Sequence, residues 1–150
     1  MALRMSRDAE EARDLVQEAF LRAARRPEAV PATDQGAEAW LVRVLVNLCR
    51  DRRRRLQVRG RVAALTGASE PRVEPETDRL DASAVRRALA ALPARRRAVV
   101  VLHEMEERPA AEIARLLGIN AVTVRWHLAR ARQELRRLLA VPAGAAEEPR

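Results

Sequence analysis

The sequence predicts an all-α protein made of two small helical modules joined by a flexible linker. Apolar residues recur at spacings of three and four in several segments, which is typical of amphipathic helices. No segment alternates apolar and polar residues for long enough to indicate a strand. The composition, with 33% charged residues, 2% aromatic residues and five glycines, is also that expected of a soluble, largely helical chain.

The first module is expected at residues 1–61. Residues 7–26 read as an amphipathic helix in which acids lead and arginines close, as the helix dipole favours. A loop with two prolines follows at 27–36, and residues 37–56 form a second long helix that 59–65 can extend. The apolar faces expected to point inward are those of Ala12, Leu15, Val16, Ala19, Phe20 and Ala23 in the first helix, and of Trp40, Leu41, Val44, Leu45, Leu48 and Cys49 in the second.

Residues 62–80 are predicted to be a linker, because the stretch from Thr66 to Asp78 mixes Gly, Pro, Ser and acidic residues without periodicity. The second module is expected at residues 81–140 and a frayed tail at 141–150. Its first helix would run over 81–92, capped by Asp81 or Ser83, and Pro93 would start the next.

Residues 109–139 carry the most specific pattern, that of two helices joined by a tight turn. Pro109 suits a first helical position, Gly118 supplies a left-handed residue that ends the first helix, and Asn120 can cap the next. An apolar seam then follows the second helix at steps of four and three, at Val124, Leu128, Ala131, Leu135 and Leu138.

The rest of this second helix is polar or cationic: Thr123, Arg125, Trp126, His127, Arg130, Gln133 and Arg137. A helix-turn-helix inserts such a helix into the DNA major groove with its N-terminal residues leading. The pattern therefore favours DNA binding, and the alternative is a helical hairpin whose basic face is only solvated.

The charge distribution agrees with a polyanionic partner. The net charge is +8, and residues 50–61 hold seven arginines against one acid, while residues 85–150 hold thirteen against seven. All 29 basic residues are arginine, so no Walker loop or Schiff-base lysine is present. With one cysteine and two histidines, a zinc site is not expected either. We therefore expect no enzyme activity, cofactor or metal, and read His103, Glu104, Glu106 and Glu107 as surface residues.

Two further expectations concern location and the single cysteine. No segment approaches the length of apolar chain that spans a bilayer, and no signal peptide precedes the first charges, so a cytoplasmic protein with no membrane contact is expected. Cys49 has no partner for an internal disulfide and is expected to be a small buried residue.

Three segments resemble one family. DAEEARDLVQEAFLRA, then AWLVRVLVNLCRDRRRR, then LPARRRAVVVLHEMEERPAAEIARLLGINAVTVRWHLARARQELRRLL are similar to bacterial sigma factors of the extracytoplasmic-function (ECF) group. The resemblance covers about residues 7–56 and 83–139, in the family's order and with a linker between. It implies a promoter-specificity subunit that binds core RNA polymerase and performs no chemistry itself.

The resemblance implies roles in the first module. The helix matching 8–25 would dock on the clamp helices of the largest polymerase subunit through Asp14, Leu15, Gln17, Glu18 and Phe20, although Leu15 and Phe20 are better read as core. The helix matching 39–55 would melt and read the promoter −10 element. Its candidates are Asn47 and Asp51, with Arg50, Arg53, Arg54 and Arg55 for phosphates. Trp40 is expected either to stack on an unpaired base or, as its apolar neighbours favour, to be buried.

In the second module, the resemblance implies a reader of the −35 element that also grips the polymerase β flap. The contacts would come from Thr123, Arg125, Trp126, His127 and Arg130. Arg125 suits a guanine edge, and Trp126 would pack on sugar or a thymine methyl unless it folds back on the core. Arg95, Arg96 and Arg97 are expected to line the same basic face, and an anti-sigma factor is a further candidate partner.

The chain departs from the family pattern twice. Residues 1–6 supply only the last turn of a preceding helix, which indicates either a misassigned start site or a truncated protein. A missing helix predicts exposed apolar surface on residues 12–23 and 40–48 and a less stable first module. Ala37 stands where an aromatic residue is common, which predicts altered −10 recognition. The competing functions are a stand-alone helix-turn-helix regulator and a degenerate sigma-like protein that sequesters polymerase or an anti-sigma factor.

Overall fold

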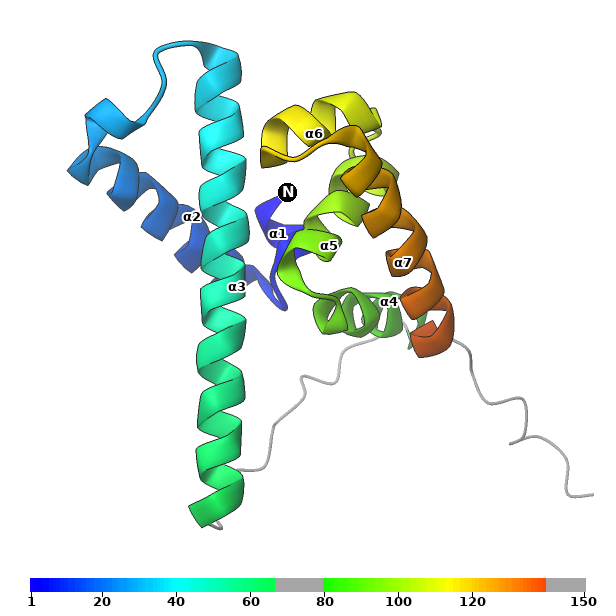
Figure 1. The fold of residues 1–150 in the computed structure, drawn as a ribbon. Coiled ribbons are helices and arrows are strands. Elements are labelled where there is room, and N and C mark those ends of the chain that lie inside the picture. The colour runs from blue at the N-terminus through cyan, green and yellow to red at the C-terminus, as the bar shows by residue number, and fades with distance from the viewer. Residues whose placement is uncertain (67–79, 140–150) are drawn as a thin grey trace, which may run out of the picture.

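The computed structural model describes residues 1–66 and 80–139, and every regular element within them is helical (Figure 1). The all-α prediction is confirmed. The elements, in order, are α1 (Ala2–Met5), α2 (Ala9–Arg25), the 3-10 turn η1 (Pro27–Ala29), α3 (Asp34–Thr66), α4 (Leu80–Ala91), α5 (Ala94–Val100), the π-helical turn η2 (Val101–Met105), α6 (Ala110–Leu117) and α7 (Ala121–Leu139).

The start of α2 is fixed by side-chain caps. Asp8 accepts a hydrogen bond from the Glu11 amide at 2.7 Å, and the Glu11 carboxylate accepts one from the Arg7 amide at 2.6 Å. One of the amides that a helix start leaves unpaired is therefore satisfied, and the residue before the cap is held as well. The predicted helix at 7–26 is confirmed to within two residues.

Helix α3 is longer than the predicted 37–56 and extends to Thr66. Gly60 is the weakest helix former in the added stretch. A Cβ atom placed on it would have no neighbouring atom within 4 Å, so no other described part of the protein packs against α3 at this point. Figure 1 shows this lower half of α3 projecting past the other helices. Residues 62–66 of the expected linker thus continue α3, and the rest of that linker up to 79 lies outside the described residues.

The predicted helical hairpin is present as α6 and α7. Gly118 has φ 65° and ends α6 in the left-handed conformation, and the Asn120 side chain accepts a hydrogen bond from the Thr123 amide at 2.7 Å. Val124, Leu128 and Ala131 are buried as predicted, and Leu135 is half-buried. Leu138 departs from the prediction with 48% exposure.

One detail of α4 was predicted wrongly. The helix begins at Leu80, before both Asp81 and Ser83, so neither residue stands at the cap position. The side chains of both lie outside the described residues.

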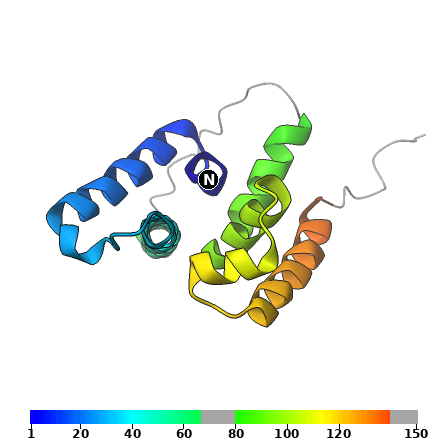
Figure 2. The ribbon, with the colours of Figure 1, turned by 90° about the horizontal axis from the view of Figure 1, so that it is seen from above.

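A single main core joins helices from both predicted modules. Figure 2 shows α5 and α6 lying between α3 and α7, and α3 packs against both of them. The largest fully buried side chains come from α1, from the α4–α5 connection, and from α5, η2, α6 and α7: Met5, Leu92, Leu102, Ile113, Leu116, Val99, Val101 and Val124. Cys49 of α3 lies in the same core, where burial raises the pKa of its thiol to about 11.

The exposed apolar surface predicted for residues 12–23 and 40–48 is found on α2 but not on α3. On α2, Val16 and Leu21 are exposed, and Phe20 is 61% exposed, so its expected place in the core is wrong. Leu15, in contrast, is buried at 4% exposure. On α3, the apolar residues of 40–48 are buried or half-buried, because α1, α5 and α6 pack against them. Of the two segments predicted to expose apolar surface, only the one on α2 does so.

Arg97 is a structural residue rather than part of a basic surface. It is 7% exposed and donates hydrogen bonds to the carbonyl oxygens of Met5 at 2.5 Å, Ala90 at 2.7 Å and Leu92 at 3.3 Å. Burial lowers the pKa of its guanidinium. The prediction that Arg97 lines the DNA-facing surface is wrong, because these carbonyls lie inside the packed helices.

No helix among residues 1–66 and 80–139 is long and apolar enough to cross a membrane.

Candidate nucleic-acid interface

The first half of α7 presents the predicted reading residues on one surface. Arg125 and Arg130 are exposed, Trp126 is 50% exposed, and Thr123 and His127 are partly covered. The seam residues of the same helix face inward, so the polar set is held outward by the packing of its neighbours. The structure therefore places all five predicted residues on the solvent-accessible side of one helix.

Trp126 is the centre of a small cluster on this surface. The guanidinium carbons of Arg96 and Arg130 lie 5.7 Å and 5.8 Å from its ring centroid, within the range of cation–π attraction. The His127 ring meets the indole edge-on at 5.0 Å between centroids. Trp126 does not fold back into the core, and this excludes one of the two readings left open by the sequence.

His127 is kept uncharged by its surroundings. Partial burial lowers its pKa first, and the positive charges of Arg96 and Arg95 lower it further. Within the described residues, its Nδ1 atom is buried without a hydrogen-bond partner. At neutral pH this side chain is therefore uncharged, and its buried Nδ1 atom is not available to a partner outside the protein.

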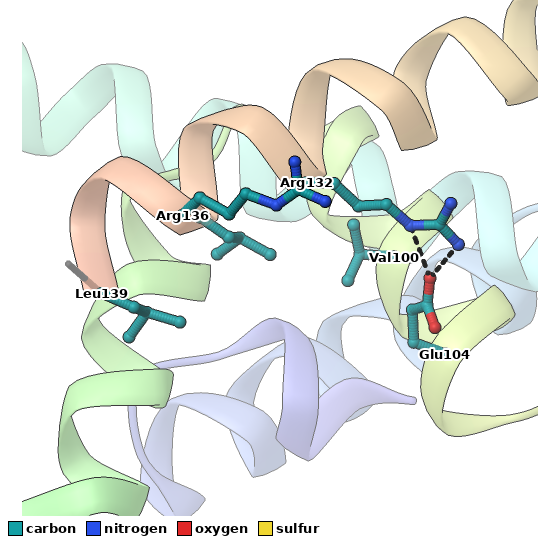
Figure 3. Close-up of a pocket in the computed structure, with 6 residues that line it drawn as sticks. Val100, Glu104, Arg132, Arg136 and Leu139 are labelled. Atoms are coloured by element: carbon teal, nitrogen blue, oxygen red, sulfur yellow. Dashed lines mark hydrogen bonds and ion pairs between the residues drawn. The ribbon is translucent and has the colours of Figure 1, made fainter.

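The C-terminal half of α7 carries a shallow groove. Figure 3 shows Val100, Leu139 and Arg136 along it, with Glu104 of η2 accepting hydrogen bonds from Arg132 at 2.7 Å and 3.2 Å. This bonding holds the pKa of Glu104 below its usual value. Arg132 is thereby engaged within the protein by Glu104.

The arginine run on α3 is divided between solvent and protein. Arg50, Arg54 and Arg55 are exposed, and Arg50 lies 3.5 Å from Asp51. Arg53 instead donates to the carbonyl oxygens of Leu92 and of Ala91, the latter at 2.7 Å. Three of the four arginines predicted to contact phosphate are therefore accessible for that role, while Arg53 bridges α3 to the end of α4.

The remaining −10 candidates lie along the earlier turns of α3. Trp40 and Asn47 are half-buried, so the fully buried tryptophan favoured by its neighbours is not observed. Part of the Trp40 side chain remains accessible from solvent.

Among the expected polymerase-contacting residues on α2, the polar ones are accessible. Gln17 is exposed, Asp14 is exposed and 3.4 Å from Arg52, and Glu18 pairs with Arg22 at 3.2 Å. Leu15 is in the core and is not available for a surface contact, as its apolar character already favoured.

Sequence reasoning missed the ion pairs that connect the two halves of the chain. Glu38 of α3 lies 3.0 Å from Arg108 and 3.5 Å from Arg115, which also donates to the Gln35 carbonyl at 3.0 Å. Partners some 70 positions apart leave no local signal in the sequence. Among the residues described, no cluster of three or more His, Cys, Asp or Glu side chains is placed to hold a metal ion.

Comparison with known proteins gives matches to both halves of the chain. Residues 1–59 match the family described as Sigma-70 region 2, and residues 82–135 match Sigma-70, region 4. The ECF RNA polymerase sigma factor SigM of Mycobacterium tuberculosis is 41% identical over 138 residues, covering 89% of this chain and 67% of the relative. SigL of the same organism is 38% identical over 138 residues, covering 90% and 78%.

The fold is also similar to that of a solved structure, the sigma factor RpoE in complex with the anti-sigma factor NepR from Bartonella quintana. The TM-score is 0.61 with 24% sequence identity, and the match covers 94% of this chain and 88% of that one. This similarity concerns the arrangement of the helices.

Proposed function

Because the chain belongs to the ECF sigma factors, which bind RNA polymerase and direct transcription initiation at promoters, we propose that α7 reads the −35 element and α3 the −10 region. The observation that carries this assignment is the outward face of α7. Thr123, Arg125 and Trp126 lie in its first two turns, after a turn built by Gly118 and Asn120. This is the geometry in which a helix-turn-helix meets base edges.

The individual contacts follow from side-chain chemistry. Arg125 presents a guanidinium fork that suits the O6 and N7 atoms of guanine, and Arg130, about one turn later, suits a phosphate. Thr123 and neutral His127 offer hydrogen bonds to base edges or to the backbone. Together they give a surface that combines base reading with electrostatic affinity.

On α3, the proposed phosphate contacts are Arg50, Arg54 and Arg55, with Asp51, Asn47 and Trp40 nearer the bases. Arg53 can contact a phosphate only when its hydrogen bond to the Ala91 carbonyl of α4 is released. Each phosphate neutralised makes affinity more salt-dependent, so these arginines contribute a non-specific component of binding. The Trp40 ring would stack on an unpaired base from its accessible side.

The proposed polymerase contacts are the exposed polar residues Asp14, Gln17 and Glu18 of α2, against the clamp helices of the largest subunit. The module around α7 would contact the β flap. No catalytic residue is assigned, because the chemistry of initiation belongs to the polymerase, and the place of action would be the cytoplasm. A stand-alone helix-turn-helix regulator is not favoured, because residues 1–59 match a polymerase-associated region.

The test is promoter-directed transcription by reconstituted holoenzyme. Arg125→Ala should reduce discrimination between the selected −35 element and single-base variants of it, by the 1–3 kcal/mol that a bidentate pair contributes. Arg130→Ala should weaken binding to all sequences equally and lower its salt dependence by about one ion. Arg86→Ala, which removes an exposed arginine on α4, is the matched control. Unchanged discrimination in Arg125→Ala would contradict the assignment of α7.

A further inference from the structure

Arg96 of α5 contacts α7 at two points. Its Nη1 atom lies 2.5 Å from the Oε2 atom of Glu134, and its guanidinium carbon lies 5.7 Å from the ring centroid of Trp126. Trp126 and Glu134 are about two turns apart on the same helix. One arginine from the neighbouring helix therefore spans this stretch of the reading helix, and it is itself mostly buried.

The indole of Trp126 would otherwise be free to change rotamer. It is half exposed, and its only near neighbours among aromatic and cationic groups of the described residues are His127, Arg96 and Arg130. Ordering an exposed side chain on binding costs conformational entropy, and a side chain already held in place avoids much of that cost. Arg96 is the one of these neighbours that comes from another helix, and Glu134 fixes its position.

The chemistry of the indole limits what it can read. Tryptophan has one N–H donor and no acceptor, and most of its surface is apolar. In the major groove, the apolar group that distinguishes one base pair from another is the thymine 5-methyl group. A tryptophan on a reading surface is therefore suited to recognise an A·T pair by apolar contact with the thymine methyl group rather than by hydrogen bonds.

We propose that Arg96 is a positioning residue, which, anchored by Glu134, holds Trp126 against a thymine methyl in the −35 element and so makes Trp126 a determinant of base preference. This inference rests on the proposed role of α7 and adds to it a residue from α5 and a specific chemical group on the DNA.

The test replaces thymine by deoxyuridine, one position at a time, in a −35 element selected by wild-type holoenzyme. This substitution removes only the methyl group. At one or two positions wild-type binding should weaken about three- to fourfold, the value of one buried methyl group. This loss of affinity is the methyl effect. In Trp126→Ala the same substitutions should have no effect.

The variant that isolates positioning is Glu134→Gln. It keeps every arginine but weakens the hold on Arg96, because a neutral amide replaces the carboxylate that accepts its hydrogen bond. Overall DNA affinity should therefore be kept or slightly increased, while the methyl effect falls below twofold. Arg96→Ala should lose the methyl effect together with some general affinity, and Arg96→Lys should recover part of it. Arg86→Ala, with the same loss of charge at an exposed position on α4, should retain the full methyl effect.

A spectroscopic measurement on the free full-length chain complements the binding test. In a Trp40→Phe background, Trp126 is the single tryptophan. Its quenching by acrylamide should increase in Arg96→Ala and in Glu134→Gln, because the indole becomes more mobile and more exposed.

Three results would overturn the proposal. They are a wild-type methyl effect below twofold at every A·T pair, a methyl effect that persists in Trp126→Ala, or one that is unchanged in both Arg96→Ala and Glu134→Gln. If wild-type holoenzyme still gives promoter-specific transcripts, such results reject this inference alone. If the wild type gives no specific transcript, the proposed function itself fails.

Discussion

The guanidinium of Arg53 donates a hydrogen bond of 2.7 Å to the backbone carbonyl of Ala91, and so ties the long helix α3 to the last residue of α4. Cations at helix C-termini satisfy carbonyls that have no partner in the helix and interact well with the helix dipole. An arginine from the run assigned to DNA phosphates thus holds together segments that match Sigma-70 regions 2 and 4.

Arg53→Ala should therefore destabilise the protein more than the loss of an ordinary surface arginine. Two carbonyls at the end of α4 lose their partner, and we expect a decrease of about 1 kcal/mol in the free energy of unfolding, because the group is only half-buried. Arg54→Ala, the exposed neighbour, should stay within about 0.5 kcal/mol of wild type. Urea denaturation measures both, and equal effects would contradict the bridging role of Arg53.

Arg97→Ala should be the most destabilising of the arginine substitutions considered. It leaves the carbonyls of Met5, Ala90 and Leu92 without their donor and opens space in a buried region. We expect a loss of about 3 kcal/mol, against little change for the exposed Arg95→Ala. A small effect in thermal or urea unfolding would show that Arg97 is not the structural residue described above.

Stability should depend on pH through His127. Its pKa in the folded protein lies below the ordinary value of 6.5, so the unfolded chain takes up a proton first as the pH falls. The contribution of neutral His127 to the free energy of unfolding is therefore complete above pH 6.5. It is lost as the pH falls from 6.5 toward the pKa of His127 in the folded protein. The free energy of unfolding, measured from pH 5 to 8, should fall more steeply toward acid in wild type than in His127→Gln. Parallel curves would contradict this.

Gly118→Ala should destabilise the turn between α6 and α7. The φ of 65° places this residue in the left-handed region, which costs a residue with a Cβ atom about 1–2 kcal/mol. The added Cβ would also lie 3.4 Å from Nη1 of Arg43, a side chain long enough to move. Gly118→Asn, a residue better tolerated in this conformation, should lower the melting temperature less than alanine does.

Local signals allowed much of the fold to be predicted. Gly118 and Asn120 each act on the backbone within a few residues, and the seam of α7 follows from helix periodicity alone. The limits of α2, α6 and α7 were therefore predicted to within about two residues. Leu138 was misplaced because periodicity does not reveal how much of a helix face its neighbours cover.

The residues that sequence reasoning placed wrongly depend on distant contacts. Arg95 and Arg97 are two residues apart in one arginine run, yet one is exposed and the other is buried against Met5, 92 positions away. Phe20 was expected in the core because it lies on the apolar face of its helix, but it is 61% exposed. The reading surface was predicted from its own helix, whereas the contribution of Arg96 required knowing that α5 lies beside α7.

The most direct test of the account is transcription from a selected promoter by purified bacterial core RNA polymerase, with and without this protein. We predict that the chain associates with the core enzyme and that the mixture gives a defined transcript, which is lost when either the −35 or the −10 element is scrambled. Failure to bind core polymerase, or binding with no promoter-dependent transcript, would contradict the central claim.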